Sequence, residues 1–169
     1  MDAIALRAMQ ALLKDRYKRE PKAAYVTLKA KGRIDDEDIL CKVEAGRPLA
    51  PAGLHPATGG TGEEPCSGDM LLEALVACAG VTLKAVAIAL DIPLKFSRVW
   101  AEGEIDFRGA LGDDDSAPVG FAQIRLRFDV KTDAPQEKLD QLLKMTERYC
   151  VVYQTLKNGL PIGMKLQRS

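Results

Sequence analysis

SGDMLLEALVACAGVTLKAVAIAL, residues 67–90, is apolar on nearly every side of the helix that its composition predicts. Glu73 and Lys84 interrupt the run, and a charge near the centre of a membrane span costs about 2.5–3.5 kcal/mol. We therefore expect a buried helix of a soluble protein, with no membrane association. Cys78 stands at the midpoint of this helix, and its thiol could serve either packing or chemistry.

The segments around this helix alternate between helical and strand-like spacing of apolar residues. Strands joined by hairpins and interleaved with helices, without regular βαβ crossovers, predict an α+β fold with antiparallel sheet, built as one domain over residues 1–169. The predicted helices are 2–17, 67–90, 134–150 and 151–159, and the predicted strands are 23–34, 39–44, 94–109, 121–133 and 162–167.

Composition excludes several classes of function. The 24 basic and 24 acidic residues cancel, so no overall charge would attract nucleic acid or an anionic membrane. Four cysteines without a C-x-x-C pair, together with the single histidine, His55, predict neither a disulfide scaffold nor a metal site. His55 lies in the Gly- and Pro-rich loop 46–62, where a turn or packing role is favoured over catalysis. The start of the chain lacks the pattern of a secretory signal, which favours the cytoplasm.

The thiols of Cys78 and Cys150 lie at positions where a reactive thiol is possible. Cys78 has Leu75 and Thr82 as helical neighbours and faces inward, where a buried thiol is normally inert unless a cation or a helix N-terminus lies near. Cys150 lies at a predicted junction between two helices, where amide donors and the helix dipole would favour its thiolate. On these residues alone, packing is favoured over redox chemistry. Cys41, on the apolar face of its predicted strand, is interpreted as a small buried hydrophobe.

A family resemblance changes this balance. PCSGDMLLEALVACAGVTLKAVA (65–87), followed by ERYCVVYQTL (147–156), resembles the OsmC/Ohr family of thiol-dependent hydroperoxide reductases. KGRID (31–35) and HPATGG (55–60) also fall where that family has corresponding elements. The resemblance covers residues 22–169 and leaves residues 1–20 as an N-terminal helical extension.

The resemblance implies an OsmC-like fold, in which antiparallel sheets wrap the long central helices of an intertwined homodimer. A physical argument agrees, because a helix that is apolar all round must be covered on every side, and a partner's helix can supply the missing cover.

The resemblance also implies a mechanism. Cys78 is the peroxidatic thiol, which attacks an organic hydroperoxide, and Cys150 resolves the resulting sulfenic acid as a disulfide. No bound cofactor is implied, and an external dithiol, lipoyl-type or other, restores both thiols. The alternative is a non-catalytic OsmC-like dimer that binds an apolar small molecule or a partner and keeps its cysteines for packing.

Arg33, in KGRID, matches the arginine that stabilises the thiolate in this family, with a solvated turn arginine as the alternative. The glutamate that orients this arginine is replaced by Gly68, so Asp69 is the candidate substitute, although a charge that favours the helix start explains Asp69 equally well. Val151 stands in place of the family's proline after the second cysteine. Cys66 has no counterpart in the family and could be an alternative resolving thiol.

Overall fold

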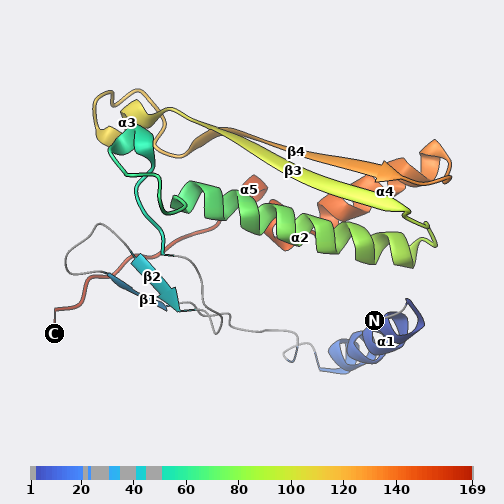
Figure 1. The fold of residues 1–169 in the computed structure, drawn as a ribbon. Coiled ribbons are helices and arrows are strands. Elements are labelled where there is room, and N and C mark those ends of the chain that lie inside the picture. Colours follow the sequence, from blue (N-terminus) through green and yellow to red (C-terminus); the bar gives the residue numbers. More distant parts are fainter. Residues whose placement is uncertain (1–2, 21–22, 24–30, 35–40, 45–50, 169) are drawn as a thin grey trace. The chain divides into compact units, whose positions relative to one another are not determined.

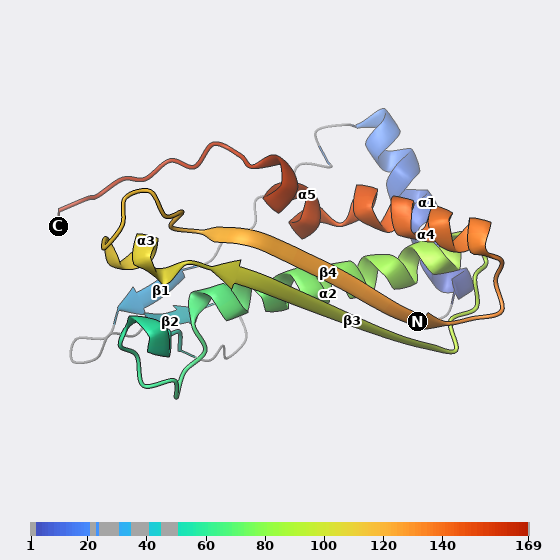
Figure 2. The same ribbon diagram turned by 90° about the horizontal axis from the view of Figure 1, so that it is seen from above.

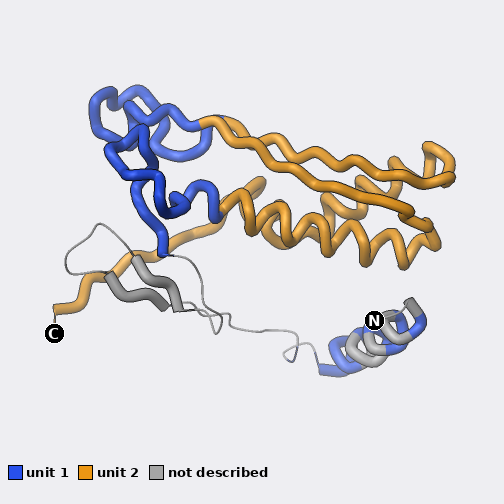
Figure 3. The backbone as a smooth tube through the Cα atoms, viewed as in Figure 1, with its two compact units in different colours: residues 1–70, 105–122 blue, residues 71–104, 123–169 orange. Residues whose placement is uncertain are grey.

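The computed structural model describes residues 3–20, 23, 31–34, 41–44 and 51–168, although some side chains of the first helix and all those of the first two strands are outside the description. The described chain divides into two compact units (Figure 3). Residues 1–70 and 105–122 make up the first unit, and residues 71–104 and 123–169 make up the second.

The first unit contains the N-terminal helix and the first hairpin. Helix α1 spans Ala3–Arg19 and confirms the helix predicted over residues 2–17. Strands β1 (Lys31–Ile34) and β2 (Cys41–Glu44) pair antiparallel, with Arg33 opposite Lys42, which confirms a hairpin over these residues. The predicted strand residues 24–30, 39 and 40 lie outside the described residues.

Short helices stand where the sequence predicts loop or strand. The 3-10 helix η2 (Pro56–Thr58) follows His55, whose Nδ1 accepts the Ala57 N–H at 3.0 Å. The His55 ring stacks on Phe107 with centroids 4.7 Å apart, so this histidine has a turn and packing role. The predicted strand 94–109 is too long, because β3 ends at Ile105 and α3 (Phe107–Leu111) follows. Asp106 begins α3 by accepting the Arg108 N–H at 3.1 Å, an N-cap that stops the strand.

Three helices and two strands enclose the core of the second unit (Figures 1 and 2). Helix α2 (Ser67–Ala89) runs along the sheet formed by β3 (Phe96–Ile105) and β4 (Phe121–Lys131). The Lys95 N–H donates to the Lys131 carbonyl where β3 begins and β4 ends, so the two strands are antiparallel, as the second predicted hairpin requires. Helices α4 (Gln136–Tyr149) and α5 (Val151–Asn158) complete the unit.

The alternation of partly buried and exposed residues along the strands shows which face of the sheet covers the core. The inward residues of β4 are partly buried and their neighbours are exposed, which confirms the predicted period of two. These residues pack with one face of α2 and with Leu142 of α4. Among the described residues α2 is the one helix long and apolar enough to cross a membrane, and one of its faces packs on this core. Its buried members are Leu75, Ala79, Leu83, Val86 and Ala87.

The C-terminal segment differs from its prediction. Residues 160–168 form no strand in the described chain, and Leu160, Ile162, Met164 and Leu166 are 57–98% exposed. The alternating pattern suits a strand, but a strand needs a neighbouring edge for its backbone hydrogen bonds, and none is paired with this segment here. Gly159 ends α5 as predicted, with φ 63°.

Adjacent leucines of α4 offer a matched test of this packing. Leu142 is 2% exposed and Leu143 is 54% exposed. Leu142→Ala should lower the free energy of unfolding by about 2–5 kcal/mol, because it opens a cavity in the core. Leu143→Ala should change it by about 0.5 kcal/mol, the range of ordinary surface substitutions. Urea unfolding followed by circular dichroism at equal protein concentration would measure both, and equal losses would contradict the assigned core face.

Candidate active site

The structure brings Cys78 and Cys150 together. Both belong to the second unit and to one apolar cluster, with Leu75, Ala79 and residues of β3, β4 and α5 around them. Cys150 is 1% exposed, Cys78 is partly buried, and both are free thiols. The two cysteines, 72 positions apart in the sequence, therefore share one environment, as the resemblance implied.

Cys150 owes its place to a break between two helices. Its N–H donates to the Thr146 carbonyl at 3.0 Å as the end of α4, and its carbonyl accepts the Gln154 N–H at 2.9 Å as the start of α5. Its backbone is extended, with φ −73° and ψ 106°, so the chain turns at this residue. The Cys150 side chain makes no capping hydrogen bond, which leaves the first N–H groups of α5 without a helical partner.

These N–H groups act on Cys78. Burial by itself raises the pKa of the Cys78 thiol, but hydrogen bonds from the Val152 N–H, the Cys150 thiol and the Val151 N–H outweigh it and lower that pKa below its usual range. The Thr82 hydroxyl donates its proton to the Cys78 carbonyl at 2.8 Å. The Cys78 sulfur therefore has the environment of a nucleophilic thiolate.

Cys150 has the opposite bias. Its burial raises the pKa of its thiol, and the neighbouring Cys78 raises it further, although the Tyr153 and Val152 N–H groups act in the other direction. A protonated Cys150 can donate its S–H to the Cys78 thiolate. The start of α5 acts on Cys150 in the expected direction, but burial and the neighbouring Cys78 outweigh it, so the expected Cys150 thiolate is not favoured.

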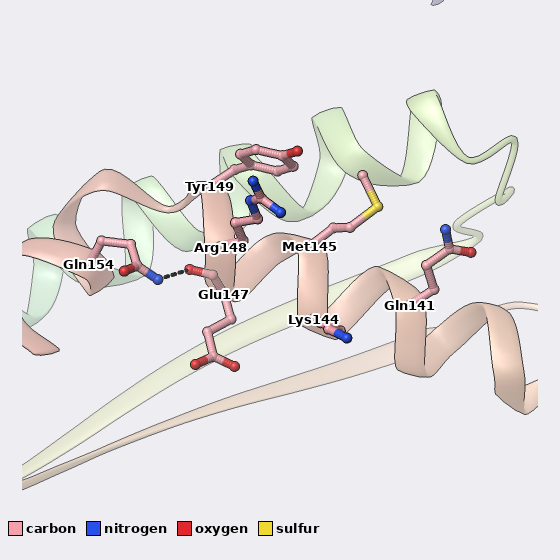
Figure 4. Close-up of a pocket in the computed structure, with 7 residues that line it drawn as sticks. All are labelled: Gln141, Lys144, Met145, Glu147, Arg148, Tyr149 and Gln154. Atoms are coloured by element: carbon pink, nitrogen blue, oxygen red, sulfur yellow. Dashed lines mark hydrogen bonds between the residues drawn. The ribbon is translucent and has the colours of Figure 1, made fainter.

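Polar contacts of Glu147 with three residues of α5 connect α4 to α5, and we call this set of contacts the Glu147 clasp. The Glu147 carboxylate accepts from the Tyr153 hydroxyl at 3.1 Å and from Lys157 Nζ at 2.5 Å. The Gln154 side-chain amide donates to the Glu147 carbonyl at 2.8 Å, the bond drawn in Figure 4. The side-chain carboxylate and the backbone carbonyl of Glu147 therefore both hold α5 onto α4 at the junction that carries Cys150.

An open hollow of about 560 Å³ lies on the outer side of this junction (Figure 4). Neither Cys78 nor Cys150 lines it, so it is not the thiol site. It is lined by Gln141, Lys144, Met145, Glu147, Arg148, Tyr149 and Gln154.

The other candidate residues belong to the first unit. Arg33 lies in β1, and its side chain is outside the description. Asp69 is exposed in the first turn of α2 and accepts the Cys66 N–H at 3.3 Å, the contact of a residue that stabilises a helix start. Cys66, directly before α2, is a partly buried free thiol. A side chain at Gly68 would begin in ordinary contact with the Cys66 sulfur and with Ile105 and Phe121.

No group of three histidine, cysteine or carboxylate side chains suited to a metal ion occurs among the described residues. The feature that sequence reasoning missed is the pair of α5 N–H groups directed at Cys78. Its signal was present at position 151, because valine has the backbone N–H that a proline there would lack.

Val151→Pro tests the contribution of this N–H. Proline is accepted at the first position of a helix, and the extended backbone of Cys150 is compatible with a following proline. The variant should raise the pKa of Cys78, so that its alkylation curve moves to higher pH. Its alkylation at pH 7 should slow about ten-fold, because a hydrogen bond to a charged group is worth about 1.5 kcal/mol.

Val151→Ala is the control, since it trims the same exposed side chain and keeps the N–H. Iodoacetamide labelling across pH, read at Cys78 by peptide mass spectrometry, would compare the two. Identical curves for Val151→Pro and Val151→Ala would show that this N–H does not act on the sulfur.

Solved structures share the fold at low sequence identity. An OsmC-like protein from Mycoplasma pneumoniae is 14% identical with a TM-score of 0.66, covering 79% of this chain and 89% of its own. An organic hydroperoxide resistance protein from Elizabethkingia anophelis is 14% identical with a TM-score of 0.63, covering 80% and 91%. The organic hydroperoxide resistance protein OhrB of Bacillus subtilis is 20% identical with a TM-score of 0.52, covering 79% and 93%.

No curated protein matches the chain. The family model described as OsmC-like protein matches residues 60–165, which is more than half of the chain and includes both Cys78 and Cys150. The first hairpin, with Arg33, lies before the matched range. The extent of this match, together with the shared fold, establishes that the chain belongs to the OsmC-like protein family.

Proposed function

We propose that this protein is a thiol-dependent peroxidase that reduces organic hydroperoxides. The observation that supports the proposal is the pairing of Cys78 with Cys150 at the start of α5, where the pKa of one thiol is lowered and that of the other is raised. The names of several structural neighbours, organic hydroperoxide resistance proteins, point to the same chemistry.

In the proposed reaction the Cys78 thiolate attacks the distal oxygen of the hydroperoxide and the O–O bond breaks. The alcohol leaves after taking a proton, and Cys78 becomes a sulfenic acid. The Cys150 sulfur then attacks the Cys78 sulfur, water leaves, and a disulfide forms. An external dithiol donates two electrons and two protons to restore both thiols, and no bound cofactor takes part.

The cluster around the thiols favours an organic substrate. Cys78 belongs to an apolar cluster with side chains of β3, β4 and α5, including Val99, Ile124 and Phe128. Such surroundings can bury the carbon chain of a hydroperoxide, whereas hydrogen peroxide would gain nothing from them. We propose Arg33 as the cation that holds the peroxide oxygen and Asp69 as its orienting acid, in addition to the amide donors of α5.

A homodimer is part of the proposal. The outer side of α2 leaves Leu71 and Val81 exposed, at 36% and 73%, with Ala74 and Ala77 between them. The apolar side chains of residues 160–168 are also exposed. Exposed apolar surface of this extent is typical of an interface, and a second copy of the chain could cover both. The free thiols suit the cytoplasm, which we propose as the compartment.

Cys78→Ser and Cys150→Ser test the two roles. With cumene hydroperoxide and dithiothreitol, Cys78→Ser should lose turnover by at least about a thousand-fold, because it removes the nucleophile. Cys150→Ser should still react once, leaving a Cys78 sulfenic acid that dimedone traps and mass spectrometry detects.

Cys66→Ser serves as the control and should turn over like the wild type, because Cys66 has no part in the proposed cycle. Equal turnover by the wild type and Cys78→Ser would contradict the proposal, and turnover by both at the rate measured without protein would favour a non-catalytic dimer that binds an apolar small molecule or a partner.

A further inference from the structure

A second cavity, of about 170 Å³, lies between α2, β4, α4 and α5 in the second unit, with Ala79 as its lining residue from α2. Cys150 is among its lining residues and Cys78 is not. Leu126 and Phe128 of β4 and Tyr153 of α5 supply much of the remaining wall, and Leu143 and Glu147 of α4 also line it.

The exposure of these residues indicates a path from solvent to Cys150. Leu143 is 54% exposed and the Glu147 side chain is 41% exposed, whereas Cys150 is 1% exposed. Leu143 and Glu147 therefore lie at the outer end of the cavity and Cys150 at its floor. The charge of Glu147 is matched by Lys157 at 2.5 Å, so the entrance offers no unpaired cation that would select an anionic ligand.

Size and chemistry limit the molecule that this cavity can take. Its volume corresponds to about six water molecules. Its wall is mainly aliphatic and aromatic, apart from Glu147, Thr146 and the Tyr153 hydroxyl. A slim, uncharged aliphatic chain with a terminal thiol fits these limits, whereas a folded reductase domain cannot enter.

We propose that this cavity is the entry site of the reductant, an aliphatic dithiol, and that reduction begins at the sulfur of Cys150. The inference rests on the proposed function, because it concerns the disulfide formed in that cycle. The cavity reaches Cys150, so the attacking sulfur meets this half of the disulfide first.

The exchange balances as follows. One thiol of the reductant loses its proton to solvent and its sulfur bonds to the Cys150 sulfur, while the Cys78–Cys150 bond breaks and Cys78 leaves as a thiolate. The second thiol then attacks the sulfur already joined to Cys150, which closes a cyclic disulfide in the reductant and returns Cys150 as a thiol. The N–H groups of Val151 and Val152 stabilise the leaving thiolate, and a better leaving group makes attack at Cys150 faster.

Leu143→Trp tests the route by narrowing the cavity entrance, and Leu156→Trp is the matched control on a partly exposed residue of α5 that does not line the cavity. Each protein is oxidised with diamide, a disulfide-forming reagent, so that the experiment does not depend on peroxidase activity. Reduction by dithiothreitol is followed by N-ethylmaleimide quenching and mass spectrometry. Leu143→Trp should slow reduction at least about ten-fold and Leu156→Trp should leave it within about two-fold, because exchange depends on access to the attacked sulfur.

The oxidation step separates this inference from the function on which it rests. Disulfide formation by cumene hydroperoxide should be within about two-fold of the wild type in both tryptophan variants, since neither alters the Cys78 environment. Reduction of Leu143→Trp at the wild-type rate would overturn the entry site. Failure of the wild type to form the disulfide with peroxide would overturn the proposed function instead.

A separate experiment shows which sulfur of the disulfide the reductant attacks. Diamide-oxidised wild type is exposed briefly to 2-mercaptoethanol, which has no second thiol to complete the exchange, and free thiols are blocked with N-ethylmaleimide. Peptide mass spectrometry should find the mercaptoethanol adduct on Cys150 and maleimide on Cys78. The reverse distribution would overturn attack at Cys150.

Discussion

The proposed thiol chemistry depends on the contact between the first N–H groups of α5 and the sulfur of Cys78. A thiol that is partly buried among aliphatic side chains has a raised pKa unless something stabilises its anion. Backbone amides meet this need without adding a charged group to the apolar cluster. They also keep a fixed direction, because the helix behind them holds each peptide group in place.

The same contact explains why two neighbouring cysteines differ. Cys78 receives donors from the helix start and from the Cys150 thiol, and its anion is stabilised. Cys150 is almost fully buried, and an anion there would face the charge on Cys78. The pKa of the Cys78 thiol is thereby lowered and that of the Cys150 thiol is raised. A single break between α4 and α5 produces both conditions, since it ends one helix at Tyr149 and begins the next at Val151.

Much of the fold could be predicted from local patterns. Period-two alternation located β4, helical spacing located α1 and α4, and the all-round apolar run located α2. The predictions failed where a side-chain contact or a neighbouring strand decides whether a segment forms a helix or a strand. Asp106 caps α3 and shortens the predicted strand, a side-chain contact that alternation does not report. Residues 160–168 keep the pattern of a strand, but a pattern cannot supply the neighbouring edge that a strand requires.

The candidate site, like the fold, was predictable where a local pattern decides it and not where a contact between distant residues decides it. The resemblance points to both cysteines, yet the contact between the α5 N–H groups and Cys78 joins residues some 70 positions apart, which periodicity cannot encode. The clasp at Glu147 extends this dependence to the protein surface. Its ion pair with Lys157 is about half exposed, so dissolved salt weakens it. Because these contacts of Glu147 set the angle at which α5 meets α4, we expect the nucleophilicity of the Cys78 sulfur to depend modestly on ionic strength.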